Sequence, residues 1–125
     1  MNLRLIEINH VALYISDLER SDHFYSVILE MPRLSRPEFD FIGTWYAIGN
    51  QELHLIADDN LKKINRNNHH FAIRVEDVFK IREALLIKGF DKMQEPKQRP
   101  DGAMQLFVTD PDNYVIEFFS KDDGS

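Results

Sequence analysis

A short stretch near the start of this chain recurs in its second half, and this internal repeat constrains the fold more than any other feature. The stretch NHVALYISDL spans Asn9–Leu18, and its counterpart lies around NHHFAIRVED, Asn68–Asp77. The aligned identities are His10 with His70, Ala12 with Ala72, and Asp17 with Asp77. Repeats of this kind are typical of a chain built from one small unit written twice.

The first copy is expected to contain a strand, a helix and three further strands. Leu5–Ile15 is rich in branched apolar residues, which is typical of a strand. Ser16, with Glu19 three residues later, has the spacing of a helix capping box. The helix is predicted over Leu18–Glu30, and Pro32 stops it. The strand candidates that follow are Leu34–Glu38, Gly43–Ile48 and Glu52–Ala57.

The second copy repeats this order. Its predicted elements are a strand at His70–Val75, a helix at Val78–Lys88, and strands at Asp91–Glu95, Met104–Thr109 and Tyr114–Ser120. We therefore predict an α+β fold with a single domain over residues 1–125, made of two tandem βαβββ modules. Module 1 covers about 1–58, a polar linker about 59–67, and module 2 about 68–121. The mixed sheets are expected to curl into a cup-like site for a metal or ligand.

Composition excludes several functional classes. The chain has 125 residues and a formal net charge of −6, which disfavours nucleic acid as a partner. It has no cysteine, so disulfides, thiolate metal sites and a cysteine nucleophile are excluded. No apolar run approaches the roughly 20 residues of a membrane span. The expected protein is soluble and cytoplasmic, with no membrane partner.

Four ionisable residues occupy matching places in the two copies. His10 and His70 open the first strand of each copy, and His54 and Glu117 lie between apolar residues in the last strands. Such a side chain in an apolar strand costs free energy unless it is paired or bound to a metal. Three imidazoles and a carboxylate suit Zn, Ni, Mn, Co or Fe, and they leave coordination positions for a substrate. The pattern predicts one divalent metal site, although a lone strand histidine is usually a hydrogen-bonded core or surface residue.

The opening NHVALYISDLERSDHFYSVIL resembles that of the vicinal oxygen chelate superfamily. This group includes glyoxalase I, fosfomycin-resistance enzymes, bleomycin-resistance proteins and extradiol dioxygenases. Its opening has a His at the start of a strand, an Asp after the strand and Phe-Tyr in the next helix, here His10, Asp17, Phe24 and Tyr25. HFAIRVED resembles the opening of its second module, and DPDNYVIEF its closing motif Asp-Pro-Asp-Gly-x-x-x-Glu. The resemblance covers nearly the whole chain.

This resemblance implies metal-ligand roles for His10, His70 and Glu117, with His54 at the fourth position. Glyoxalase I has a glutamate where this chain has His54, so the acid–base part of that reaction is in question. Glu52 could supply a carboxylate there only if the strand register shifts. The implied function is a glyoxalase-like lyase or isomerase in which a small metabolite chelates a divalent metal through two oxygens. Glu117, or His54 if it is not a firm ligand, is the candidate base.

Other branches of the superfamily remain as alternatives. Extradiol dioxygenases share the two His and the Glu, but they carry a Tyr where this chain has Phe107. Fosfomycin-resistance enzymes have a cationic substrate loop, and this chain offers Lys97 and Arg99. A non-catalytic binding protein of the antibiotic-resistance type is the second functional class, although such relatives lack the metal ligands.

Further residues are candidates for a substrate pocket. Trp45 and Tyr46 could form an aromatic wall or belong to the core, and Arg74 could hold a substrate carboxylate or face solvent. Phe107 completes the predicted pocket. The expected partners are a small-molecule substrate and a second copy of the chain in a homodimer. The cup could form within one chain or by exchange of modules between two chains.

Overall fold

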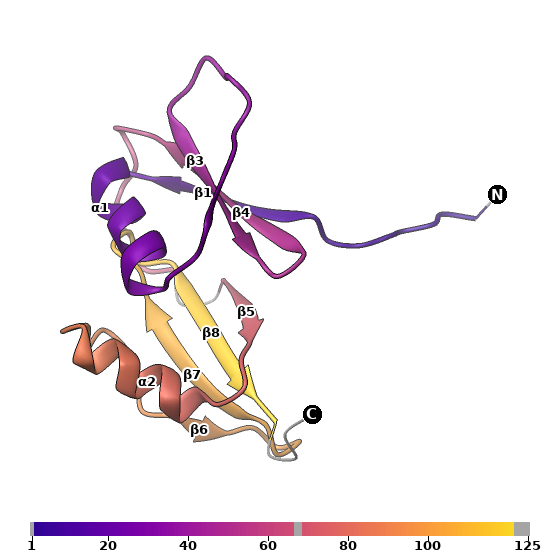
Figure 1. The fold of residues 1–125 in the computed structure, drawn as a ribbon, viewed down its shortest axis with the longest axis vertical. Coiled ribbons are helices and arrows are strands. Elements are labelled where there is room, and N and C mark those ends of the chain that lie inside the picture. The colour runs from indigo at the N-terminus through magenta and orange to yellow at the C-terminus, as the bar shows by residue number, and fades with distance from the viewer. Residues whose placement is uncertain (1, 67–68, 122–125) are drawn as a thin grey trace.

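The computed structural model describes residues 2–66 and 69–121, in which two four-stranded sheets carry helices on one side (Figure 1). Module 1 contains β1 (His10–Ile15), α1 (Leu18–Asp22), the π-helical segment η1 (His23–Ile28), β2 (Arg33–Leu34), β3 (Gly43–Ile48) and β4 (Gln51–Ala57). Module 2 contains β5 (His70–Arg74), α2 (Val78–Ile87), β6 (Lys97–Gln98), β7 (Met104–Thr109) and β8 (Val115–Ser120). The predicted α+β architecture of two similar modules is confirmed.

Both sheets have the same strand order. The orders are β1-β4-β3-β2 and β5-β8-β7-β6. In each sheet the first and last strands of the module run parallel, and the remaining neighbours run antiparallel. A parallel pair needs a long crossover between its strands, and the helix and the two intervening strands provide it. The strands β1 and β5 therefore lie at sheet edges.

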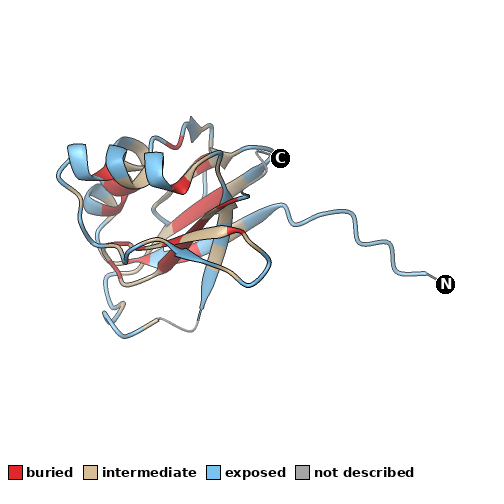
Figure 2. Cartoon of the chain, turned by 90° about the horizontal axis from the view of Figure 1, so that it is seen from below, coloured by how far each residue is buried: buried red, intermediate tan, exposed pale blue. Residues whose placement is uncertain are grey.

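Alternation along each strand separates a buried face from an open face. In β1, Leu13 and Ile15 are buried in the core, whereas His10 and Ala12 are exposed. In β7, Leu106 is likewise fully buried on the helix-covered side. Figure 2 shows the buried residues concentrated where the sheets meet the helices. Because successive side chains of a strand point to opposite faces, the candidate ligands lie on the open faces.

Buried carboxylates at the turn between β7 and β8 join the two modules. The Asp110 carboxylate accepts a hydrogen bond from the Tyr25 hydroxyl at 2.7 Å, and the Asp112 carboxylate accepts from the Ser16 backbone N–H and hydroxyl. Both aspartates are 1% exposed. Burial raises the pKa of Asp110, and the nearby Asp110 charge adds to the effect of burial in raising the pKa of Tyr25. This network holds module 2 against the helix of module 1.

Equivalent aspartates begin the two helices. Asp17 accepts from the backbone N–H of Arg20, and Asp77 accepts from those of Phe79 and Lys80. The predicted N-cap at Ser16 is therefore wrong by one residue. The Ser16 hydroxyl instead donates to Asp112, because the buried carboxylate lies within reach at 2.5 Å. The cap is thus part of the repeat, whereas Ser16 belongs to the module junction.

The first residues of the chain form an extended arm. A strand is predicted from Leu5, but the observed strand begins at His10, and residues 2–8 project away from both sheets (Figure 1). The side chains of Leu5 and Ile6 are 92% and 86% exposed. Apolar strand-forming residues alone do not make a ladder, because a strand needs a neighbour to pair with. This arm is the largest exposed apolar segment of the described chain (Figure 2).

Other elements differ from the predicted bounds. The helix of module 1 continues beyond Asp22 as π-helix and ends at Ile28, and the strand predicted at 34–38 is limited to β2. The segment 91–95 pairs with β7 only through an isolated bridge from Met93 to Val108, and the short strand follows at β6. Gly43, at the start of β3, has no room for a side chain, because a Cβ would lie 2.2 Å from the Leu55 carbonyl oxygen.

Candidate functional site

The strand register places His54 and Glu117 at equivalent positions. Ala12 in β1 lies opposite His54 in β4, and Ala72 in β5 lies opposite Glu117 in β8. Since Ala12 and Ala72 align in the repeat, the two ionisable residues occupy the same place in their sheets. Both project from the open face, because their strand neighbours point into the core.

In module 1, a stack of rings surrounds His54. The rings of His10 and His54 are 4.1 Å apart between centroids, and those of Trp45 and His54 are 3.8 Å apart and almost parallel. His54 is therefore only 9% exposed, although it lies on the open face. Trp45, opposite His54 in the ladder, serves as the aromatic wall beside this candidate ligand.

Hydrogen bonds orient both imidazoles of module 1. The Nε2 atom of His54 lies 2.8 Å from the Glu52 carboxylate, and Nδ1 of His10 lies 2.8 Å from the Asn9 side-chain oxygen. Ionised carboxylate and amide oxygens only accept, so each of these nitrogens carries the proton. The other ring nitrogen is then left with the lone pair that could bind a metal. Ligand histidines in metal sites have this kind of outer partner.

The sequence predicts no role for Glu52 without a register shift, because it lies two positions from His54. That same spacing places the two side chains on one face, and the register places Glu52 directly opposite His10. The relevant signal was therefore present in the strand parity. What the sequence lacked was the contact between the carboxylate and the imidazole.

In module 2, polar side chains surround Glu117. Its carboxylate lies 3.3 Å from Nε2 of His70, accepts from the Gln105 amide and lies 3.7 Å from the Arg99 guanidinium. The Glu117 side chain is 6% exposed, and that of His70 is 42% exposed. A buried carboxylate is tolerated when charged and polar donors compensate for lost hydration. Arg99 also donates to Asp101 and lowers the pKa of that carboxyl to about 2.

The structure leaves the predicted pocket residues on different sides of the sheets. Arg74 follows His70 by an even number of positions and shares its open face. The Phe107 ring meets the His70 ring edge-on at 5.8 Å. Tyr46 is not a pocket residue: it is fully buried on the helix-covered face, as the core alternative predicts, and its hydroxyl donates to Asp22. Because Trp45 and Tyr46 are adjacent in one strand, only one of them can face the open side.

The candidate metal ligands form two pairs within one chain. His10 and His54 meet in module 1, and His70 and Glu117 meet in module 2. Within residues 2–66 and 69–121, no set of three or more His, Asp or Glu side chains is arranged to hold a metal ion. The imidazole and carboxylate donors suit a divalent metal by type. By geometry, each pair on its own provides half of the predicted ligand set.

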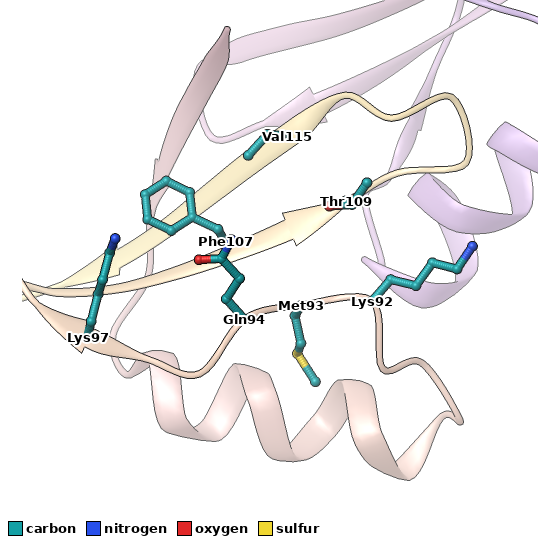
Figure 3. A pocket seen from close by; sticks show the side chains of 7 residues that line it. All are labelled: Lys92, Met93, Gln94, Lys97, Phe107, Thr109 and Val115. Carbon is teal, nitrogen blue, oxygen red and sulfur yellow. The ribbon is translucent and has the colours of Figure 1, made fainter. Parts of the chain in front are cut away.

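A hollow of about 530 Å³ (Figure 3) is lined by Phe107, the residue whose ring meets that of His70 in module 2. Phe107, Thr109 and Val115 line it from the open face of the sheet, while Lys97 reaches it from β6. Its remaining lining residues are Lys92, Met93 and Gln94. Its volume falls within the range of small-molecule sites.

The described part of the chain has no helix with the length and apolar character of a membrane span.

Comparison with known proteins identifies the family. The model of the Glyoxalase/Bleomycin resistance protein/Dioxygenase superfamily matches residues 7–118, which include all four candidate ligands. The chain belongs to this superfamily. Its lactoylglutathione lyase relative from Haemophilus influenzae is 31% identical over 123 residues, covering 90% of this chain and 91% of that protein.

Two further comparisons limit and support this assignment. Lactoylglutathione lyase GLX1 of Arabidopsis thaliana is 27% identical over 122 residues, but the chain spans only 43% of the length of that protein. The crystal structure of the glyoxalase family protein from Enterococcus faecalis superposes on this chain with a TM-score of 0.78, and the two sequences are 25% identical. That alignment covers 91% of this chain and 97% of the other. The family is thus supported over residues 7–118, and the fold over 91% of the chain.

Proposed function

We propose that this chain is a glyoxalase-like, metal-dependent lyase or isomerase acting on a small metabolite that chelates the metal through two oxygens. The observation that carries the proposal is the pair of register-matched donor sets, His10 with His54 and His70 with Glu117. The similarity to proteins named lactoylglutathione lyase supports this class of reaction. The metal is one divalent ion, of the group Zn, Ni, Mn, Co and Fe.

A second copy of the chain completes the site in this proposal. Each chain supplies two separate donor pairs, so module 1 of one copy has to face module 2 of the other to form a four-ligand set. Two features suit such a homodimer. The edge strands β1 and β5 are available for pairing, and the exposed apolar side chains of the N-terminal arm would be buried against the second copy.

Each residue then has a defined role. His10, His54, His70 and Glu117 are the ligands. Glu52 fixes the position of the proton on the His54 imidazole, and Asn9 does the same for His10. A bound divalent metal supplies Lewis-acid stabilisation of negative charge on the substrate oxygens.

The remaining roles belong to groups around the ligands. Glu117 is the base that removes a proton from the substrate, and Gln105 and Arg99 hold its carboxylate in place. Trp45 and Phe107 wall the site, and Arg74 is placed on the same face as His70 to bind a substrate carboxylate.

The deciding experiment uses complementation between two inactive variants. His10→Ala and His70→Ala chains, each with a different affinity tag, are co-expressed, and the mixed dimer is purified for metal analysis and proton-exchange assays. In a site shared between copies, the mixed dimer keeps one intact site, with both lesions in the other. We expect half the metal content and half the activity of the parent dimer, and close to none in either variant alone.

Two outcomes would contradict the proposal in different ways. A mixed dimer without metal, beside a parent that binds it, would place the site within one chain. A parent that binds none of the five metals would reject metal-dependent catalysis and leave small-molecule binding as the function. Circular dichroism of both variants controls for misfolding.

A further inference from the structure

The hollow beside Phe107 has a charge opposite to that of the whole chain. Lys92 and Lys97 both line it, and none of its lining residues is a carboxylate, although the chain has a formal net charge of −6. In residues 2–66 and 69–121, neither ammonium forms an ion pair, whereas the nearby Arg99 is bound by Asp101 and Glu117. Two unpaired cations in one concave site favour an anionic ligand.

The backbone explains why polar side chains gather on this side. Met93 pairs with Val108 and points toward α2, so its neighbours Lys92 and Gln94 face the open side of the sheet (Figure 3). The carbonyl of Lys92 accepts from the Thr109 N–H, which fixes this segment beside β7. The hollow is therefore built by strand pairing and not by a mobile loop.

Of the two lysines that line the hollow, Lys97 lies closer to the proposed metal ligands of module 2. Its ammonium lies 5.2 Å from the centroid of the Phe107 ring, and the His70 ring lies 5.8 Å from the same centroid. Phe107 is also the ladder partner of Glu117. The aromatic ring thus forms a floor with the ligand pair on one side and the ammonium on another.

We propose that Lys97 binds an anionic group, a phosphate or a carboxylate, on a substrate whose chelating oxygens face His70 and Glu117. The carbon skeleton of that substrate lies over Phe107. This inference rests on the proposed function, because it takes the ligand pair as the place of the chelating oxygens. An ammonium is a suitable partner for an oxyanion, and a partly desolvated setting strengthens the contact.

Lys92 offers an internal control. It lies beside Thr109, whereas Lys97 lies opposite Gln105, so the two lysines are separated by four ladder positions, or about 13 Å along the strand. A three-carbon ligand chelated near His70 can reach Lys97 but not Lys92. The two lysines should therefore respond differently to the same short probe.

The test uses three probes that share a 2-hydroxy acid head: glycerate, 3-phosphoglycerate and malate. Glycerate lacks the distal anion, 3-phosphoglycerate carries a phosphate, and malate carries a carboxylate. Calorimetric titration of the zinc-loaded parent should give about tenfold tighter binding of at least one anionic probe than of glycerate. Whichever of 3-phosphoglycerate and malate binds more tightly identifies the preferred oxyanion.

Lys97→Gln should reduce this preference to less than about threefold and leave glycerate binding unchanged, because only the ammonium is lost. Lys92→Gln and the exposed Lys80→Gln should leave all three affinities unchanged. No preference in the parent would overturn the inference, as would a preference that persists in Lys97→Gln. An equal loss of the preference in Lys97→Gln and Lys92→Gln would also overturn it, because the effect would then come from the overall positive charge of the hollow.

Metal analysis of the same samples separates this inference from the proposed function. If zinc binds but the anionic probes show no preference, the inference fails and the proposed function stands. If none of the five metals (Zn, Ni, Mn, Co and Fe) binds, the proposed function fails. Titration of the metal-free protein with the same probes still tests the anion site. A preference for an anionic probe that is lost in Lys97→Gln supports the site, and the absence of any preference overturns it.

Discussion

In module 1 the residue opposite Ala12 is His54, enclosed between two rings, whereas in module 2 the residue opposite Ala72 is Glu117, surrounded by polar side chains. The ladder positions are the same, but the means of stabilisation differ. A neutral imidazole can be buried by stacking, while a carboxylate needs donors. The repeated backbone therefore fixes where a side chain points, and its neighbours determine which chemistry that place can hold.

The same contrast appears in the turns before the last strands. The Gly49-Asn50 turn of module 1 is exposed, whereas the equivalent turn of module 2 contains the buried Asp110 and Asp112. Only one copy of the turn has been adapted to join the modules. A turn that is expendable in one module is thus structural in the other.

The largest expected effect follows from this difference. Asp112→Ala should lower the free energy of unfolding by about 3 kcal/mol, because the half-buried Ser16 N–H and the neighbouring hydroxyls lose their acceptor. The matched variant Asn50→Ala, in the exposed turn, should change it by less than about 0.5 kcal/mol. Urea denaturation at pH 7 measures both. Equal losses in the two variants would contradict the asymmetry between the turns.

A smaller effect is expected at the imidazole of module 1. Glu52→Gln should weaken zinc binding about tenfold, because a neutral amide supports the His54 proton less well than a carboxylate. Competition with a chelating dye gives the affinity. Gln51→Ala, one residue earlier and exposed, serves as the control. Unchanged affinity in Glu52→Gln would mean that the stacked rings alone orient His54.

The smallest effect concerns a pair of charge-reversed ion pairs. Asp22 binds Arg33 in module 1, and the equivalent helix position in module 2 is Arg82, which binds Glu95. The Arg33 hydrogen bond and charge lower the pKa of Asp22 below its ordinary value of 3.8, with help from Tyr46. Asp22→Asn should cost about 1 kcal/mol at pH 7. Arg82→Gln should cost less, because Glu95 is 81% exposed.

The pH dependence gives the sign of the Asp22 contribution. A carboxyl with a lower pKa in the folded chain stabilises the fold above the unfolded value near 3.8. That stabilisation is lost as the pH falls through the lower, folded pKa. Thermal unfolding between pH 5 and about pH 2 should therefore show a steeper acid loss in the parent than in Asp22→Asn. Parallel curves would remove Asp22 from the acid response.

Strand parity explains what the sequence could predict. The positions of His10, His54, His70 and Glu117 on the open faces followed from the repeat, because aligned strands share their alternation. The same rule could not choose between Trp45 and Tyr46, since adjacent residues face opposite sides. It also could not exclude Leu5 from the first strand, because the missing partner is a property of the whole fold.

Contacts between distant segments account for the remaining differences. Ser16 was expected to cap a helix, but Asp112, far away in the sequence, engages its hydroxyl. The sequence shows Lys97 only as one of two cations in a predicted loop, whereas strand pairing in the structure places its ammonium over the Phe107 ring. In the proposed function a second copy brings the four candidate ligands to one metal, and strand parity within one chain does not predict such a partner.

The tight approach of β3 to β4 at Gly43 affects how mutational data on this protein should be interpreted. Any side chain at this position would collide with the Leu55 carbonyl, since even a Cβ comes within 2.2 Å. In a comprehensive scan of single substitutions, position 43 would therefore be as intolerant as a metal ligand. An assay of folded protein abundance beside the activity selection would separate the two, since replacements at Gly43 would deplete both signals.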